Sequence, residues 1–383
     1  MRDRVAIAGI GYTPLTRDSG VSTLTLGCRA ILAAIEDAGL RPDEVDGLAT
    51  HRVGDSVLPG VLAQALGIRD LRWYADQFGG GSSSCAIVGQ AALAVYAGLA
   101  DAVVCYRAIN ARSEFRMGGI GRPPVDAVET QYQAPYGYFV PAQQFAMAAR
   151  QHMLRHGTTH EQFGAVAVAQ RGHAVHNERA MLREPIDLAD YLASRWVVEP
   201  FRLLDCCLET DGAVALVLVS AERARDLRRR PVLVRAAAWG SGFTLYSNRQ
   251  PDLTTTPAAA MARRLWSQAG LGPAEVDVAE LYDCFTYTVV VQLEDYGFCK
   301  KGEGGPFAAS GAIRIGGSLP VNTHGGFLSE GYVHGLNHVA EAVSQLRGDA
   351  GARQVDGAEV ALCTAQPGYV SGNTAALVLR RAP

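Results

Sequence analysis

Apolar residues near the start of the chain follow the period of a helix, and apolar runs on both sides of that segment are typical of strands. Positions 24, 28, 31, 32 and 35 are apolar at three- to four-residue spacing, and Gly39 follows where a left-handed residue commonly ends a helix. Apolar runs at 5–10 and 47–50 flank this segment. The pattern predicts a β–α–β unit at the start of the chain.

A second copy of this unit occurs later in the chain. Residues 38–46 read AGLRPDEVD, and residues 269–277 read AGLGPAEVD. The second copy also follows an amphipathic helix pattern and leads into an apolar strand, at 278–281, and another strand precedes it at 232–236. Because the same order of elements occurs twice, we predict two duplicated α/β halves.

Later elements continue the correspondence between the halves. A helix pattern at 87–97 leads to a strand at 102–106, and a helix pattern at 336–346 leads to a strand at 360–365. The first half then lacks a final strand until the apolar run at 211–219, which is typical of a buried strand. The chain between these two strands of the first half is therefore an insertion.

The insertion covers residues from about 107 to 200 and is rich in Gly, Pro, Tyr, His and Arg. One helix in it is predicted to begin at Thr158 or Thr159, where a capping box follows. We predict an N-terminal half at 1–229, which contains this inserted loop domain at about 107–200, and a C-terminal half at 230–383.

Three histidines of the insertion could place metal ligands on one helix face, because they recur at positions 152, 156 and 160. Met153 stands where a metalloprotease motif requires a glutamate, and Gly157 is predicted to end the helix before the third histidine. Arg155 lies beside them. We interpret these histidines as a solvent-exposed face and predict no metal site.

Composition and charge exclude several classes of protein. The 383 residues carry 35 basic and 38 acidic side chains, a formal net charge of −3, which provides no basic surface for a nucleic-acid backbone. No run approaches the roughly 18–20 apolar residues of a membrane helix, and residues 1–4 lead directly into a strand. The eight cysteines form no C-x-x-C pair. We expect a cytoplasmic protein with reduced thiols and no membrane or nucleic-acid partner.

Short motifs along the whole chain resemble those of the thiolase superfamily. They are AGLAD at 97–101, LDCC at 204–207, TDGA at 210–213, YDCF at 282–285, NTHGG at 322–326 and GYVHG at 331–335. The resemblance implies an α/β fold of five layers (αβαβα) built from two duplicated halves. It also implies a homodimer joined through the central sheets, for which the apolar residues Val103 and Val104 would supply a hydrophobic face.

Three positions that are catalytic in thiolases differ in this chain. Gly81 stands where the motif spacing places the nucleophilic cysteine, within the run GGGSSSC. Tyr282 replaces an asparagine or histidine, and Tyr332 replaces the histidine of the next loop. Cys363 is expected in a buried strand and not at an acid–base position. Since a glycine cannot form an acyl-enzyme, these differences argue against chemistry through a covalent intermediate.

The altered set resembles a narrower branch of the sterol-carrier or lipid-transfer type, the thiolase-like aldolases that cleave steroid side chains as CoA thioesters. The glycine run before Cys85, the segment YRAINARS at 106–113 and the two glycine-rich loops carry this resemblance. It implies retro-aldol cleavage of a 3-hydroxyacyl-CoA, such as a 17-hydroxy steroid side-chain thioester, to a ketone and a short acyl-CoA such as propionyl-CoA. No covalently bound cofactor is implied, because the substrate itself carries coenzyme A.

The same resemblance assigns Tyr282 and Tyr332 as the catalytic pair. A phenol can act as base and acid if neighbouring donors or cations lower its pKa from about 10. The sequence does not show which tyrosine takes which role. His334 and His324 flank Tyr332, and either could assist it or be hydrogen-bonded within the wall of the loop.

Two glycines of the same loop are candidates for substrate binding. Gly325 and Gly326 would let backbone N–H groups approach the thioester oxygen, as an oxyanion hole requires. Asp283, next to the first tyrosine, could orient its neighbours or cap a helix.

The resemblance further implies a partner protein. Members of this branch work with a small OB-fold partner related to zinc-ribbon proteins, which here would give a heterotetramer. Glycines and prolines are frequent in the insertion, at positions 118, 119, 121, 123, 124, 135 and 137. We expect this loop domain to be ordered when a partner packs on it.

Two other functions remain open on the sequence. One is a thiolase-like acyltransferase that uses Cys85, displaced by one helical turn from the expected position. The other is a non-catalytic scaffold that binds acyl-CoA or lipid. Each tyrosine taken alone could also be a packed aromatic with its hydroxyl bonded to the backbone.

Overall fold

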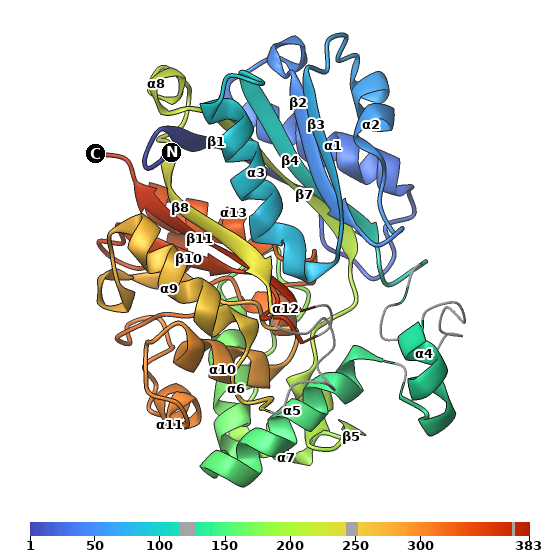
Figure 1. Cartoon of the computed structure of the whole chain (residues 1–383), viewed down its shortest axis with the longest axis vertical. Coiled ribbons are helices and arrows are strands. Elements are labelled where there is room, and N and C mark those ends of the chain that lie inside the picture. The colour runs from blue at the N-terminus through green and yellow to red at the C-terminus, as the bar shows by residue number, and fades with distance from the viewer. Residues whose placement is uncertain (115, 117–127, 139, 243–251, 370–371) are drawn as a thin grey trace.

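A nine-stranded sheet runs through the part of the chain that the computed structural model describes, which is residues 1–114, 116, 128–138, 140–242, 252–369 and 372–383. Its strand order is β3-β2-β4-β7-β1-β8-β11-β10-β9 (Figure 1). The strands are β1 (Val5–Tyr12), β2 (Gly47–Arg52), β3 (Trp73–Phe78), β4 (Ala102–Asn110), β7 (Asp211–Ser220), β8 (Val232–Ser241), β9 (Val278–Glu280), β10 (Val360–Thr364) and β11 (Asn373–Arg381).

The boundary between β1 and β8 divides this sheet into two half-sheets. Only Ala6 with Leu233 and Ile7 with Val232 pair across it. On the two sides, β2 matches β9, β4 matches β10, β7 matches β11 and β1 matches β8 in position, while β3 is additional to the first half. The parallel pairs β2–β4 and β9–β10 and the antiparallel pairs β4–β7 and β10–β11 agree as well. The predicted duplication is confirmed.

The helices of the described residues comprise those that cover both faces of the half-sheets and those of the insertion. They are α1 (Thr23–Ala38), α2 (Pro59–Leu66), α3 (Ser84–Tyr96), α4 (Val128–Gln133), α5 (Pro141–His156), α6 (His160–Ala174), α7 (Leu188–Ala193), α8 (Ala221–Ala224), α9 (Pro257–Ala269), α10 (Thr286–Asp295), α11 (Gly304–Ala309), α12 (Gly326–Ser329) and α13 (Leu336–Arg347). Both α3 and α13 contact strands of the two half-sheets and each other, whereas α1 packs on β1, β4 and β7, and α9 on β8 and β11.

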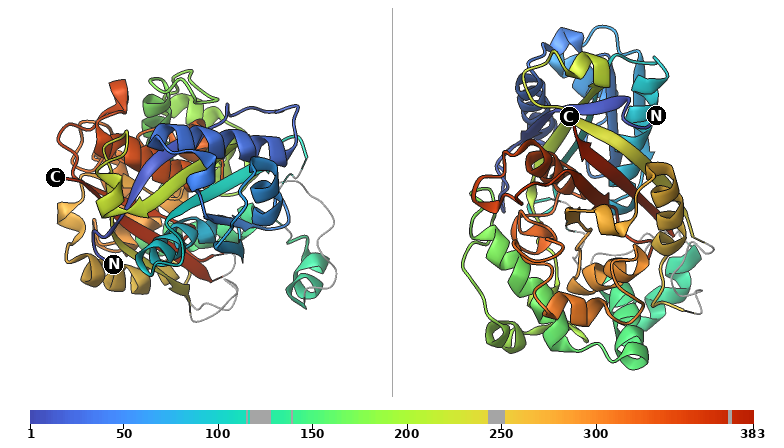
Figure 2. Two further views of the ribbon diagram at one scale, coloured as in Figure 1. Left: turned by 90° about the horizontal axis from the view of Figure 1, so that it is seen from above. Right: turned by 90° about the vertical axis from the view of Figure 1, so that its left-hand side faces the viewer.

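The buried apolar side chains separate into clusters that match these layers. Along β1, Val5 and Ile7 belong to the central cluster around α3 and α13, while Ala6 and Ala8 belong to the cluster under α1. Such alternation is expected, because successive side chains of a strand point to opposite faces. A third cluster joins α9, α10 and the insertion. The order helix, sheet, central helices, sheet, helix confirms the predicted five layers (Figures 1 and 2).

The repeated sequence motif forms the same local structure in both halves. Gly39 and Gly270 take left-handed φ angles of 76° and 65° and end α1 and α9. A 3₁₀ turn follows each, at Pro42–Glu44 and at Pro273–Glu275. The strand after each turn, β2 or β9, then enters its half-sheet beside β4 or β10.

The aspartate that ends each copy of the motif fixes the start of the neighbouring strand. Asp46 accepts hydrogen bonds from the backbone N–H groups of Asp101 and Ala102, at 2.9 Å each. Asp277 accepts the equivalent bonds from Glu359 and Val360, at 2.8 and 2.9 Å. The two copies therefore have the same local geometry, because each carboxylate accepts hydrogen bonds from backbone N–H groups at the start of the neighbouring strand.

The insertion leaves the first half-sheet after Asn110, because β4 continues past residue 107. It holds α4 to α7 and a two-stranded sheet of β5 (Trp196–Val198) and β6 (Phe201–Arg202). Helix α6 packs against α10, α11 and α12, so the insertion lies beneath the second half (Figures 1 and 2). The glycines and prolines at 118, 119, 121, 123 and 124, part of the basis for expecting a partner on this loop domain, lie outside the described residues.

The predicted boundary between two helices of the insertion is confirmed, but the exposed histidine face is wrong. Gly157, with φ of 73°, ends α5, and Thr159 caps α6. His152 is fully buried, and its ring nitrogens lie 2.8 Å from Thr158 Oγ1 and 3.0 Å from Glu294 Oε2. This histidine therefore joins the insertion to α10 and does not face solvent.

Among the described residues, every helix is too short or too polar to cross a lipid bilayer.

The two matched aspartates generate a prediction about stability. We expect Asp277→Ala and Asp46→Ala each to lower the free energy of unfolding by about 1–3 kcal/mol, because each leaves two backbone N–H groups without their acceptor. Asp43→Ala is the control: among the described residues, the Asp43 side chain is paired with Arg41 alone, on the exposed surface, and its loss should cost under about 0.5 kcal/mol. Chemical denaturation measures all three, and equal effects would contradict the proposed role.

Candidate active site

Three loops meet at the end of the central layer and bring two phenols together. Tyr282 follows β9, Tyr332 lies between α12 and α13, and Gly81 begins the 3₁₀ turn Gly81–Ser83 that leads into α3. The hydroxyl oxygens of Tyr282 and Tyr332 are 2.5 Å apart. The two tyrosines that the sequence placed on separate loops therefore form a hydrogen-bonded pair.

Position 81 has room only for a glycine. A Cβ atom built on Gly81 would lie 1.6 Å from the hydroxyl oxygen of Tyr282 and 2.0 Å from its Cζ atom. The phenol of Tyr282 thus occupies the volume that any side chain at position 81 would need. A nucleophilic cysteine at position 81 and this tyrosine conformation exclude each other.

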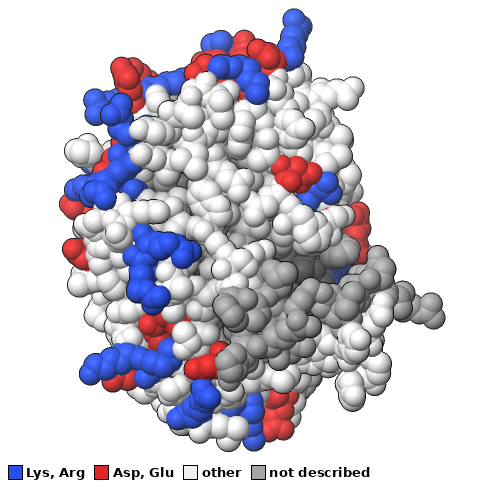
Figure 3. All heavy atoms as spheres, viewed as in Figure 1, with Lys and Arg blue, Asp and Glu red and all other residues white. Residues whose placement is uncertain are grey.

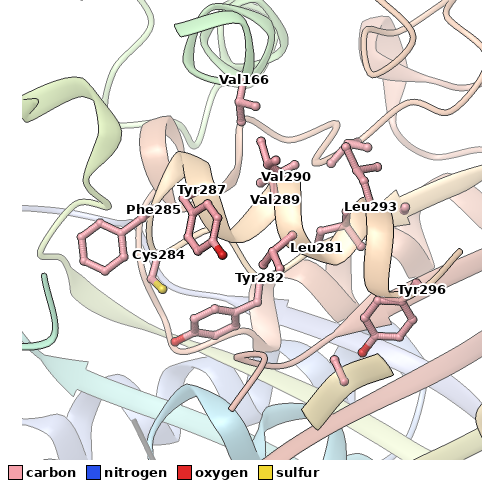
Figure 4. Close-up of a cluster of buried hydrophobic side chains, with 14 of the residues drawn as sticks. Val166, Leu281, Tyr282, Cys284, Phe285, Tyr287, Val289, Val290, Leu293 and Tyr296 are labelled. Carbon is pink, nitrogen blue, oxygen red and sulfur yellow. The ribbon is translucent and has the colours of Figure 1, made fainter. Parts of the chain in front are cut away.

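Backbone and side-chain contacts hold Tyr282 in place. Its N–H donates to Thr364 Oγ1 at 2.9 Å, and its carbonyl accepts from Thr288 Oγ1 and Gln292 Nε2, both at 2.8 Å. Its ring meets Phe327 edge-on. The residue is 1% exposed and belongs to the buried cluster of the second half (Figure 4). The phenol is consequently fixed from β10, α10 and α12 at once.

Tyr332 is positioned by its backbone and by two rings. Its N–H donates to Thr210 Oγ1 at 3.0 Å. The preceding Gly331 has a φ of 153°, and a Cβ atom there would lie 3.0 Å from Leu15. The ring of Tyr332 packs edge-on against Phe327 and against His334, at a centroid distance of 4.7 Å from the latter. Phe327 therefore supports both phenols.

His334 connects Tyr332 to a buried ion pair. Arg107 Nε lies 3.0 Å from His334 Nδ1, and Arg107 Nη2 lies 2.5 Å from Asp55 Oδ2. Because a guanidinium only donates hydrogen bonds, Nδ1 must carry the lone pair and a neutral His334 carries its proton on Nε2. Burial, and then the charge of Arg107, lower the pKa of His334 well below its usual value. At neutral pH the ring is therefore neutral.

Both phenols are protonated in the resting site. Burial, and then the proximity of Tyr332, raise the pKa of Tyr282 well above 10. Burial also raises the pKa of Tyr332, although the hydrogen bond with Tyr282 and the charge of Arg107 act in the opposite direction. A pKa lowered by donors or cations, the condition stated for acid–base action of a phenol, is not met in the resting site, because removal from water outweighs the nearby cation.

Several known proteins are similar to this chain in sequence and structure. The Thiolase C-terminal domain-like family model matches residues 243–381. A 17-hydroxy-3-oxo-4-pregnene-20-carboxyl-CoA lyase of Mycobacterium tuberculosis is 47% identical over 375 residues, which are 95% of this chain and 97% of that protein. A steroid side-chain-cleaving aldolase of Thermomonospora curvata is 47% identical over 353 residues, 90% of each chain. This chain belongs to the steroid side-chain-cleaving aldolases of the thiolase superfamily.

The fold agrees with that assignment. The chain superposes on the Ltp2-ChsH2(DUF35) aldolase with a TM-score of 0.93 at 44% identity, over 99% of this chain and 98% of that one. The protein is accordingly a carbon–carbon lyase of the thiolase superfamily, as the sequence motifs implied.

In this aldolase, His324 lies in a different environment from His334. Its Nδ1 atom is 3.0 Å from Glu280 Oε2, its Nε2 atom is 3.5 Å from Glu330 Oε2, and its ring packs against His338. Burial opposes its charge, but the carboxylates of Glu330 and Glu280 raise its pKa to about 9. Of the two histidines expected to assist Tyr332, it is His334 that contacts the phenol.

The two glycines expected to form an oxyanion hole have other contacts. The N–H of Gly325 donates to the carbonyl of Asn322 at 2.9 Å and closes a turn. A Cβ atom on Gly326 would lie 2.1 Å from Asp283 Oδ2. Asp283 accepts from the N–H of Phe327 at 2.9 Å and so caps α12. The glycine pair thus makes room for this cap and for Ala174, which a Cβ atom on Gly325 would meet at 2.6 Å.

The cysteine considered as a displaced nucleophile points into the core. Cys85 is 1% exposed, and its Sγ atom lies 3.5 Å from the carbonyl oxygen of Cys363. Burial raises the pKa of the Cys85 thiol to about 12. Because the thiolate is the nucleophilic form, Cys85 is inert here. Cys363 is fully buried in β10, as expected.

Sequence reasoning did not single out Arg107 or Asp55. Arg107 is fully buried in the middle of β4, where every residue is buried. One signal was available, since a lone arginine within an apolar strand requires a buried partner. That partner, Asp55, lies just after β2, far from Arg107 in the sequence, and no pattern around it indicated its role.

The close approach of Gly81 and Tyr282 predicts the effect of a single methyl group. Gly81→Ala should displace the Tyr282 phenol, break its 2.5 Å contact with Tyr332, and lower lyase turnover on the order of 10²-fold. The control is Gly172→Ala on the exposed face of α6, where an added Cβ meets nothing within 4 Å. A crystal structure and steady-state rates check both. Wild-type turnover in Gly81→Ala would contradict the steric account.

Proposed function

We propose that this aldolase cleaves the side chain of a 17-hydroxy steroid carried as a CoA thioester, releasing a 17-ketone and propionyl-CoA. The relative named as a 17-hydroxy-3-oxo-4-pregnene-20-carboxyl-CoA lyase matches 95% of this chain. The observation that carries the proposal is the phenol pair at 2.5 Å, beside a glycine that leaves no nucleophile. CoA enters as part of the substrate, and no covalently bound cofactor is invoked.

The reaction in this proposal is a retro-aldol step that conserves every atom and needs no oxidant. The hydroxyl oxygen loses its proton, its electron pair forms the ketone, and the bond to the carbon next to the thioester breaks. The electrons of that bond pass into the thioester enolate. Protonation of the enolate carbon then gives the short acyl-CoA. Two proton transfers are required, and two positioned phenols can supply them.

The raised pKa values of both phenols support a relay between neutral tyrosines. Tyr332 accepts the substrate proton while its own proton moves to Tyr282, and Tyr282 protonates the enolate carbon. We assign Tyr332 to the hydroxyl side because the charge of Arg107 favours its ionised form, whereas no cation acts among the main influences on Tyr282. His334 is a positioning residue that packs on the Tyr332 ring.

The relay predicts which hydroxyl groups are essential. Tyr282→Phe and Tyr332→Phe should each lower cleavage of the steroid CoA thioester by on the order of 10²–10⁴-fold, the usual scale for a lost general acid or base. Acyl-CoA binding should persist, because each ring is retained. Cys85→Ala should keep most of the activity, since its thiol is buried away from the phenols.

Mass spectrometry of the products is the measurement. If Cys85→Ala were inactive while both phenylalanine variants kept near-normal activity, the result would favour the acyltransferase hypothesis. A labelled acyl group on Cys85 would establish it. Failure of the wild-type chain to turn over any 3-hydroxyacyl-CoA, alone or with its partner, would favour the non-catalytic scaffold.

We propose that the chain forms a homodimer through the free edge of the first half-sheet. Val103 and Val104, which the sequence suggested for the interface, are fully buried within the sheet. The edge strand β3 instead exposes Tyr74 and Phe78, which are 65% and 83% accessible. Few charged side chains occupy the adjoining face over α3 (Figure 3), where Tyr96 is also exposed. A second copy would cover this apolar surface.

We propose further that two copies of a small OB-fold protein, related to zinc-ribbon proteins, join two such chains in a heterotetramer. The Ltp2-ChsH2(DUF35) complex, with a TM-score of 0.93 to this chain, supports a partner of that kind. The described part of the insertion exposes Tyr136 and Leu154, at 87% and 76%, which suits a contact surface. We place the assembly in the cytoplasm, because the eight cysteines are free thiols.

These assemblies predict distinct masses in solution. Light scattering should give a dimer for the chain alone and a heterotetramer after addition of the partner, with higher turnover. Phe78→Lys should shift the chain toward monomer, whereas Tyr136→Lys, a matched exposed aromatic in the insertion, should not. A monomer at micromolar concentration, or turnover unchanged by the partner, would contradict the corresponding proposal.

A further inference from the structure

Three side chains of metal-ligand type meet behind Tyr282. They are Glu280 at the end of β9, His324 in the loop before α12, and His338 on α13. One ligand atom of each lies within 4.8 Å of the other two, and all three side chains are fully buried. The aldolase mechanism above uses none of them.

His338, one of the three, has a ring nitrogen without a hydrogen-bond partner. Its Nε2 atom lies 2.9 Å from Asp283 Oδ1 and 3.0 Å from the carbonyl oxygen of Leu281, so it carries the proton. Nδ1 consequently holds a lone pair, and it is buried without a hydrogen-bond partner among the described residues. A carboxylate behind the proton-bearing nitrogen is the usual arrangement for a histidine that binds a metal through the other one.

The side chains of His324 and Glu280 lie close together but are not aligned for a hydrogen bond. Glu280 Oε2 and His324 Nδ1 are 3.0 Å apart, yet neither atom makes a hydrogen bond of acceptable geometry within the described structure. A separation of this size suits two ligands of one ion at metal–ligand distances of about 2.0–2.2 Å. Glu330 Oε2 lies 3.5 Å from the second nitrogen of His324, again as an outer carboxylate. Glu280 Oε1 is held by Thr323 Oγ1 at 3.0 Å.

The charges around the cluster do not balance. Four carboxylates surround it, from Glu280, Asp283, Glu330 and Glu341, and all are fully buried. Two guanidiniums face them: Arg353 lies 3.0 Å from Glu341, and Arg179 lies 3.4 Å from Glu330. Carboxylates therefore outnumber guanidiniums around the cluster, and either a proton on His324 or a bound cation would offset part of that excess.

We propose that Glu280, His324 and His338 bind a divalent transition-metal ion, with Zn²⁺ as the ion that suits two imidazoles and a carboxylate. Its charge offsets the excess of the surrounding carboxylates. The ion would hold the Tyr282 loop, because Glu280 and Asp283 flank Leu281–Tyr282 and His338 packs on Phe327 at 4.0 Å. Phe327 in turn contacts both phenols.

Metal analysis of the full chain tests this site. The chain, purified without a metal-affinity step, freed of metal and then dialysed against Zn²⁺, should retain about one ion per chain by plasma mass spectrometry. Glu280→Gln and His338→Gln should each reduce that content at least tenfold. His152→Gln is the control, because His152 is equally buried but lies between Thr158 and Glu294, and it should retain the ion.

Cobalt substitution identifies the ligands without reference to activity. Co²⁺ in the wild-type chain should give visible d–d bands without thiolate charge-transfer bands, since none of the three ligands is a cysteine. Zn²⁺ should also raise the melting temperature of the wild-type chain. Absence of both retained metal and a thermal shift in the wild-type chain would overturn the site, whether or not the variants fold. Metal content unchanged in Glu280→Gln, or a thiolate spectrum, would overturn it as well.

Discussion

The Tyr282 phenol and a side chain at position 81 cannot occupy the same volume, and the chemistry of the site follows from this exclusion. A Cβ atom at position 81 would lie 1.6 Å from the phenol oxygen. A nucleophilic side chain at position 81 and the Tyr282 phenol in its present place are therefore mutually exclusive. With no acyl-enzyme available, the site is left with two neutral hydroxyl groups in contact, that of buried Tyr282 and that of partly buried Tyr332. Such a pair can move protons without forming a covalent intermediate.

The duplicated halves support this pair from equivalent strands. On β4, Arg107 reaches the loop of Tyr332 through His334. On β10, the strand that corresponds to β4, Thr364 accepts the hydrogen bond from the N–H of Tyr282. The glycine that makes room comes from the first half, and both phenols come from the second. The site consequently exists only where the central helices bring the two half-sheets together.

Buried charged groups lie behind both tyrosines, as a balanced ion pair in one case and an excess of carboxylates in the other. Arg107 and Asp55 form an ion pair behind Tyr332, and the guanidinium keeps His334 neutral. Behind Tyr282, the carboxylates around His324 outnumber the guanidiniums. Groups of this kind are expensive to bury, so their presence in a well-packed layer indicates a function beyond stability. We have assigned one network to positioning Tyr332 and the other to binding a cation.

The sequence alone determined the layers, the duplication and the identity of both phenols. The repeat at 38–46 and 269–277 sets local turns, and local turns depend on nearby residues, so they could be predicted together with the Thr159 cap. Burial and long-range contacts could not be predicted in this way. The raised tyrosine pKa values, the buried His152 and the separation of His324 from the phenols depend on residues far apart in the chain. The cluster of Glu280 with two histidines has no spacing motif, because three elements supply its members and only tertiary packing brings their ligand atoms within 4.8 Å.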